Sequence, residues 1–169
     1  MTDPATGTFL FLLFVSPICL FVAWSDMKFM RIPNWSVLAL LAVFACSGPF
    51  LMPLAEYGWR WVHGLVILGI GFVVSSLRMV GAGDAKFAAA MAPFVALQDA
   101  ALVLVLFSAV LLAAFATHRA ARRVPALRSL TPDWESWTRD RDFPMGLALS
   151  GTLMLYLALL LILPAVTLR

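Results

Sequence analysis

Residues 100–117 read AALVLVLFSAVLLAAFAT, an uninterrupted stretch without charge that is dominated by Ala, Leu, Val and Phe. As an α-helix rising 1.5 Å per residue, it would extend over roughly 27 Å and cover most of the roughly 30 Å hydrocarbon core of a bilayer. A charge-free stretch of this length predicts a transmembrane helix.

The composition of the whole chain also favours lipid as the solvent. The 169 residues are 63% hydrophobic and 12% charged, with a mean hydropathy of +0.96. A soluble domain carries about twice that share of charge, so this much apolar surface would not fit into one water-soluble core. The net charge of +3 is unevenly placed along the chain, and we interpret it as a signal of membrane orientation. No nucleic-acid partner is expected.

The two cysteines, Cys19 and Cys46, both lie inside apolar stretches. Their spacing matches neither a paired Cys-x-x-Cys zinc site nor a disulfide framework, so we interpret them as small buried hydrophobic side chains. The sequence therefore predicts no metal and no cofactor.

Uncharged stretches recur along the chain and predict an all-α, polytopic membrane protein with a single membrane-embedded domain over residues 1–169. The six expected spans are approximately 7–25, 34–54, 61–78, 84–98, 100–117 and 144–163. The first is interpreted as a span and not a cleaved signal peptide, because residues 1–8 contain an acid and no base. The fourth is the weakest, because its uncharged part, Phe87–Gln98, is short enough for a re-entrant segment.

The positive-inside rule orients the six spans with both termini on the non-cytoplasmic side. Arg60 and Arg169 then lie outside, and the cytoplasmic set of basic residues is Lys28, Arg31, Arg78, Lys86, Arg119, Arg122, Arg123, Arg128, Arg139 and Arg141. A fourth segment that only dipped into the membrane would place the arginine-rich segment outside. We therefore expect the fourth segment to cross fully.

The longest polar segment is the predicted cytoplasmic loop 118–142, which holds six Arg and four acidic residues. One interpretation is a solvated loop that lies on anionic lipid headgroups, with its tryptophans at the interface. The other is a docking surface for a substrate or a partner.

Two aspartates, Asp26 and Asp84, stand at the cytoplasmic ends of predicted spans, where ionisable residues indicate function. Asp26 follows the first span, and Asp84 opens the fourth within Gly81-Ala82-Gly83-Asp84. Two such carboxyls facing each other share one proton, because like charges at short range resist ionising together. The ionised partner can deprotonate water and the neutral one can polarise a peptide carbonyl, as in an aspartic protease.

Structural roles compete with catalysis for the same residues. Asp84 could cap a helix, and Asp26 could pair with Lys28 or Arg31. Gly81 and Gly83 would allow a sharp turn and close approach of a substrate strand. Lys28 and Lys86 are interpreted first as interfacial anchors, with tuning of the acids or substrate orientation as the alternative.

Three segments resemble the type IV prepilin peptidases, most closely the small form that serves Flp (tight-adherence) pili. The first is Asp26-Met27-Lys28-Phe29-Met30-Arg31-Ile32-Pro33-Asn34, similar to the family's aspartate, basic stretch and Ile-Pro-Asn. The second is Gly81-Ala82-Gly83-Asp84-Ala85-Lys86-Phe87, similar to Gly-x-Gly-Asp-x-Lys. The third and weakest, Phe143-Pro144-Met145-Gly146-Leu147-Ala148, looks like Pro-x-Gly-x-Ala.

The resemblance implies an aspartic endopeptidase of the bacterial cytoplasmic (inner) membrane, with Asp26 and Asp84 as the catalytic pair. Its substrate would be a prepilin, whose basic leader is cut off at the cytoplasmic face. Pro33 and Asn34 match motif positions that end a loop and start the second span, and no catalytic role is carried over from the third segment. Larger members also N-methylate the pilin and carry paired Cys-x-x-Cys motifs. This sequence has no such cysteines, so peptidase activity alone is expected.

Two other functions remain open at the level of sequence. A small transporter or channel could use the two aspartates to bind protons or cations, but the first, second and fifth spans show almost no interior polar residues. An inactive pilus-assembly subunit would have lost a motif aspartate, and neither is replaced.

Overall fold

The computed structural model describes residues 4–139 and 142–163 of the chain. Within these residues every regular element is helical, which confirms the all-α prediction. The α-helices are α1 (Pro4–Phe29), α2 (Asn34–Leu51), α3 (Leu54–Ser76), α4 (Ala82–Met91), α5 (Ala100–Ala121), α6 (Pro125–Leu130) and α7 (Met145–Ile162). Three short 3-10 helices are η1 (Ala92–Phe94), η2 (Leu97–Asp99) and η3 (Glu135–Trp137).

The pattern of side-chain burial is typical of a protein embedded in lipid. The core lies between α1, α2, α4 and α7, where Val15, Leu40, Phe44, Phe87 and Leu153 are fully buried. By contrast, the apolar side chains of α3 and α5 point mostly outward. Water would make such exposure costly, whereas hydrocarbon removes the cost, because lipid tails are as apolar as the side chains themselves.

Five helical segments are long and apolar enough to cross a membrane, and they correspond to five of the six predicted spans. They are Ala5–Phe29, Asn34–Leu51, Leu54–Ser76, Leu97–Ala121 and Met145–Ile162. The third begins well before the predicted residue 61, and its first turns include an (i, i+4) salt bridge of 2.7 Å between Glu56 and Arg60. These charged residues end the apolar stretch of the sequence, but the helix continues through them.

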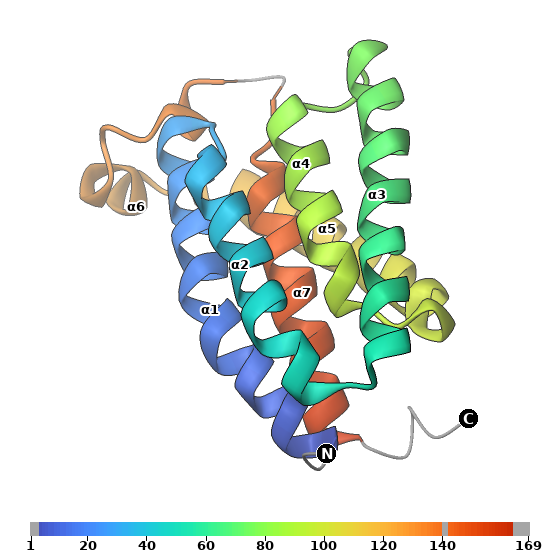
Figure 1. Ribbon diagram of the computed structural model, residues 1–169. Coiled ribbons are helices and arrows are strands. Elements are labelled where there is room, and N and C mark those ends of the chain that lie inside the picture. Colours follow the sequence, from blue (N-terminus) through green and yellow to red (C-terminus); the bar gives the residue numbers. More distant parts are fainter. Residues whose placement is uncertain (1–3, 140–141, 164–169) are drawn as a thin grey trace.

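The predicted fourth span, 84–98, is not one long helix. α4 stops at Met91, and Pro93 follows inside η1, because proline has no N–H to donate and its ring blocks a continuing α-helix. The chain nevertheless returns along the bundle toward the start of α5 (Figure 1). The start of α1 and the end of α7 lie toward one end of the bundle (Figure 1), and a complete sixth crossing stays a prediction.

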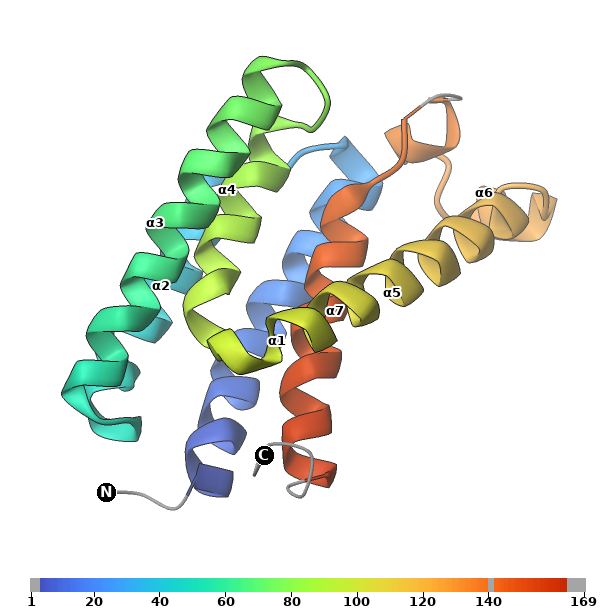
Figure 2. The same cartoon turned by 90° about the vertical axis from the view of Figure 1, so that its right-hand side faces the viewer.

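The order of packing explains why α1 and α7, far apart in sequence, form the centre of the molecule. α7 packs along α1, α4 packs on α2, α3 and α7, and α5 contacts mainly α7. Figure 2 shows α5 inclined steeply to α7, so that its last turns and α6 stand away from the bundle. This arrangement places the start of α4 and the start of α7 near the end of α1.

Two details of the sequence-based prediction need correction. Cys19 is buried as expected, but Cys46 is exposed, because an apolar residue of a membrane helix can face lipid as readily as the core. The predicted loop 118–142 is partly helical: α5 continues to Ala121, and α6 and η3 follow. η3 packs back against α1. This placement depends on tertiary contacts, which hydropathy does not predict.

Candidate active site

Asp26 lies in the last turn of α1 and is almost entirely buried, with 5% of its surface exposed. The helix ends just beyond it, because Met30 adopts a left-handed backbone conformation with φ of 49°. The Met30 N–H donates to the Asp26 carbonyl at 2.9 Å, and the Ser25 hydroxyl donates to the Arg31 carbonyl at 3.0 Å. These bonds hold the turn, and therefore the position of the Asp26 side chain, in place.

The carboxylate of Asp26 is held by the start of α7. The backbone N–H of Gly146 donates to Asp26 Oδ2 at 2.6 Å. Pro144, which precedes α7, offers no side-chain cap, so Asp26 satisfies one of the free N–H groups that every helix start leaves. A Cβ atom at position 146 would lie 2.9 Å from Asp26 Oδ2 and 3.1 Å from its Cγ, so the contact requires glycine.

Asp84 occupies the third position of α4 and bonds back to the residue that precedes the helix. Its carboxylate accepts a hydrogen bond from the backbone N–H of Gly81, which is half of a capping box. Asp84 is therefore a helix-capping residue, as one of the competing interpretations held. It lies outside the five long apolar helices. Burial raises the pKa of its carboxyl to about 6, although the Gly81 N–H lowers that pKa.

The fold brings the two aspartates together. α4 packs against α7, whose first turn holds Asp26, and the aspartate-bearing ends of α1 and α4 lie toward the same end of the bundle (Figure 1). Capping by Asp84 does not compete with this proximity, because a carboxylate has two oxygens with several acceptor sites. Asp26 is buried and Asp84 half-buried, and two carboxyls at close range can share one proton.

The two aspartate-bearing segments are also joined by a side-chain contact. Lys86 Nζ on α4 donates to Asn34 Oδ1 at 3.3 Å, and Asn34 is the first residue of α2. α2 begins where Pro33 and Asn34 were expected to start it, and the Ser36 hydroxyl donates to the Pro33 carbonyl at 2.7 Å. A Cβ atom on Gly83 would lie at ordinary contact distance, 3.5 Å, from Ile32 Cβ.

Lys28 does not pair with the aspartates. Its ammonium lies 5.4 Å from the ring centroid of Trp24 and 5.2 Å from that of Phe29, a cation–π arrangement. Among the described residues, no salt bridge joins Asp26 to Lys28 or Arg31. The ion-pair interpretation of Asp26 is therefore not supported, and anchoring at the membrane interface stays a prediction for Lys28.

Gly146 is the residue of this site that sequence reasoning missed. Its segment was noticed, but no role followed from it, because the contact with Asp26 joins residues 120 positions apart. A signal was present nonetheless: Pro144 just before an apolar stretch marks a helix start, and a glycine in the first turn leaves the N–H groups accessible to an acceptor.

The model of the Type IV leader peptidase family matches residues 13–117. This chain belongs to that family. The matched region includes both aspartates, and the match confirms the resemblance seen in the motifs. Neither the curated proteins nor the solved structures contain a match to this chain.

Membership in the leader peptidase family indicates a membrane-bound peptidase whose substrate is a prepilin. It favours that activity over the transporter or channel considered above. Gly146 lies beyond the matched residues, so its contact with Asp26 adds a third segment of the leader peptidase to the site.

Proposed function

We propose that this leader peptidase removes the basic leader of Flp-type prepilins, with Asp26 and Asp84 as its catalytic carboxyls. The observation that supports the proposal is that three helix ends lie near one another. The last turn of α1 brings Asp26, the first turn of α4 brings Asp84, and the first turn of α7 brings the Gly146 N–H. The three segments are those that resemble the prepilin peptidase motifs.

The chemistry follows from one proton shared by two carboxyls. The ionised carboxyl takes a proton from a water molecule, whose oxygen attacks the carbonyl carbon of the scissile peptide. The neutral carboxyl gives its proton to the carbonyl oxygen. Collapse of the tetrahedral intermediate then breaks the C–N bond, and the amine leaves with a proton from the pair. The Gly146 N–H orients the Asp26 carboxyl throughout, so this carboxyl does not need to reorganise during the reaction.

Charge placement supports a cytoplasmic active site in the bacterial inner membrane. The ends of α1, α3 and α5 lie toward one end of the bundle (Figures 1 and 2). The basic residues at these ends are Lys28, Arg31, Arg78, Arg119, Arg122 and Arg123. The aspartates lie toward the same end, whereas Arg60 lies near the start of α3, at the other. Cytoplasmic ends of membrane helices carry such an excess of Lys and Arg.

The proposed substrate matches the site in charge and shape. An acidic pair suits a leader rich in Lys, and a groove among the membrane helices would hold the apolar helix of the prepilin. The motif residues Gly81, Gly83, Lys86, Lys28, Pro33 and Asn34 would support substrate binding or the geometry of the aspartates, within one domain over residues 1–169.

The test is co-expression of the protein with candidate Flp-type prepilins, followed by mass determination of the product. We expect the wild type to release a pilin shortened by its leader. Asp26→Asn and Asp84→Asn should each abolish processing, because a neutral amide can neither accept the proton of water nor share one. The same masses show whether the mature N-terminus is methylated, which we do not expect.

A matched control removes an acid elsewhere. Asp133 is exposed and lies in the segment between α6 and η3, and Asp133→Asn should leave processing unchanged. Continued cleavage by the Asp26→Asn/Asp84→Asn double variant would refute the assignment of the pair. Cleavage of other prepilins but no Flp-type prepilin would refute the substrate while leaving the mechanism standing.

A further inference from the structure

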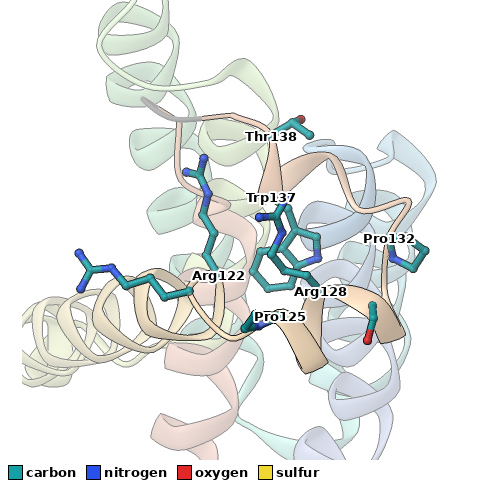
Figure 3. Close-up of a pocket in the computed structure, with 8 residues that line it drawn as sticks. Arg122, Pro125, Arg128, Pro132, Trp137 and Thr138 are labelled. Atoms are coloured by element: carbon teal, nitrogen blue, oxygen red, sulfur yellow. The ribbon is translucent and has the colours of Figure 1, made fainter.

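An aromatic cluster joins the end of α5 to the start of α7. Its members are His118 and Phe115 on α5, Trp137 in η3, and Phe143, which lies just before α7. A pocket lies beside Trp137, but the arginine side chains that line it do not converge on it (Figure 3), and we assign no ligand to it. The contacts that the cluster makes toward the bundle indicate its role instead.

His118 contributes the flat ring that two other members of the cluster contact. Only 3% of its surface is exposed. Neither ring nitrogen has a hydrogen-bond partner among the described residues, although buried polar groups usually have one. The ring stacks on Trp137, with 5.1 Å between the centroids and 11° between the planes, and meets Phe143 edge to face at 5.8 Å. Aromatic rings prefer both arrangements, so His118 acts here through its ring and not through its nitrogens.

The Trp137 side of the cluster rests on α1. Trp137 has 6% of its surface exposed, and its indole N–H donates to the Thr131 carbonyl and hydroxyl, each at 3.0 Å. η3, which carries Trp137, packs on α1, the helix whose last turn holds Asp26. The stack of His118 on Trp137 therefore connects the end of α5 to an element that lies against the aspartate-bearing helix.

The Phe143 side of the cluster leads directly into α7. Phe143 also contacts Phe115, with 5.7 Å between the ring centroids, so two residues of α5 hold it. Pro144 follows, is fully buried, and restricts the backbone because its ring fixes φ. Soon after it, the Gly146 N–H donates to Asp26 Oδ2 at 2.6 Å. Only two residues separate Phe143 from Gly146, so a shift of Phe143 would displace this N–H.

We propose that His118 is a positioning residue of the leader peptidase, whose ring keeps the Gly146 N–H on the Asp26 carboxyl. Its ring contacts reach both partners of this hydrogen bond, because η3 packs on α1 and Phe143 leads into α7. A carboxyl held in place in this way needs no search for its reactive orientation. The consequence for cleavage rests on the proposed catalytic role of Asp26, whereas the consequence for the Gly146 N–H does not.

Nuclear magnetic resonance of the full chain in detergent, labelled with isotope-enriched glycine, tests the position of Gly146 without any substrate. The chain has 10 glycines, and the signal that Gly146→Ala removes belongs to the Gly146 amide. His118→Leu replaces the flat ring by an apolar side chain of similar size. It should shift the Gly146 amide proton upfield, because the short bond to a carboxylate is lost, and should speed its exchange with solvent about tenfold or more. An unchanged Gly146 signal would overturn the proposal.

The kinetics of prepilin processing test the link from His118 to cleavage. Because the aromatic cluster orients a carboxyl and does not bind the substrate, His118→Leu should lower kcat about tenfold and leave KM within about twofold of wild type. His118→Phe restores a flat ring without the nitrogens, so it should match the wild type in kcat and in the Gly146 signal. A shifted Gly146 signal with unchanged kcat would overturn the positioning role. A His118→Phe protein that behaves like His118→Leu would overturn the role of the flat ring.

Phe11→Leu is the matched control for a loss of stability alone. Phe11 is a buried ring in the first half of α1, far from the turn that carries Asp26, and it packs on two other rings. Phe11→Leu should lower Tm, because it also removes a buried ring, but should leave kcat and the Gly146 signal unchanged. Equal losses of kcat in Phe11→Leu and His118→Leu would show that His118 only stabilises the fold, and would overturn the proposal.

Phe143→Leu covers the case in which His118→Leu does not fold. Phe143 is only half-buried, so the loss of its ring is better tolerated. Since it is the ring that connects His118 to α7, Phe143→Leu should shift the Gly146 signal and lower kcat in the same direction. A wild-type signal and a wild-type kcat in this variant would refute the proposal. A wild type that processes no Flp-type prepilin would refute the proposed function instead, and the Gly146 signal would still decide the role of His118.

Discussion

The backbone N–H of Gly146 donates to Oδ2 of Asp26 at 2.6 Å and thereby fastens the start of α7 to the end of α1. The bond serves both partners, because α7 lacks a side-chain cap of its own and the carboxylate lies in a buried position that offers little water. A site whose first carboxyl is oriented by a helix start should be sensitive to anything that widens this contact.

Gly146→Ala should therefore damage the site. The new methyl would lie 2.9 Å from Asp26 Oδ2, so either the carboxyl or α7 must move. We expect prepilin processing to fall by roughly 10- to 100-fold and stability by about 1–3 kcal/mol. Gly69→Ala is the matched control, since a Cβ there meets nothing within 4 Å. Normal processing by the Gly146→Ala protein would contradict the role given to the contact.

Alanine substitutions of the two motif glycines before Asp84 should differ in their effect on processing. A Cβ on Gly81 would lie 2.6 Å from Asp84 Oδ2, whereas a Cβ on Gly83 would lie 3.5 Å from Ile32. Since the Asp84 side chain can rotate away, Gly81→Ala should cost little stability but at least about tenfold in processing rate. Gly83→Ala should stay within about threefold of wild type. The reverse order of effects would show that substrate approach, and not the Asp84 contact, requires the glycines.

The hydrogen bond between Lys86 and Asn34 should contribute modestly to the fold. The bond is exposed and 3.3 Å long, so a double-mutant cycle with Lys86→Met and Asn34→Ala should give a coupling energy of about 0.5 kcal/mol in thermal unfolding. Strict additivity would mean that the contact does not link α4 to α2.

The raised pKa of Asp84 predicts how stability depends on pH. Burial places this pKa at about 6, whereas an unfolded aspartate titrates near 4. The folded protein therefore binds this proton more tightly, and its stability should fall as pH rises from about 4 to about 6 and then level off. Thermal unfolding of wild type and Asp84→Asn in detergent measures the difference. An identical pH dependence in both proteins would contradict the raised pKa of Asp84.

Local chemistry made much of the fold predictable. A stretch such as residues 100–117 partitions into lipid whatever its neighbours do, and its backbone hydrogen bonds close within the helix, so hydropathy alone predicted the membrane helices. Pro33 and Asn34 likewise predicted the start of α2. Hydropathy did not predict the end of α4 at Met91 or the start of α3 at Leu54.

By itself, the sequence determined a helical membrane protein with two aspartates in motifs that mark the leader peptidase family. Only the tertiary structure decided that Gly146 holds Asp26 and that Trp137 stacks on His118 beside an arginine pocket. The physical reason is the separation along the sequence of the residues that make contact. Transfer into lipid and helix formation are properties of each segment, whereas contacts of 2.6 Å between residues 120 positions apart depend on how all the helices pack together.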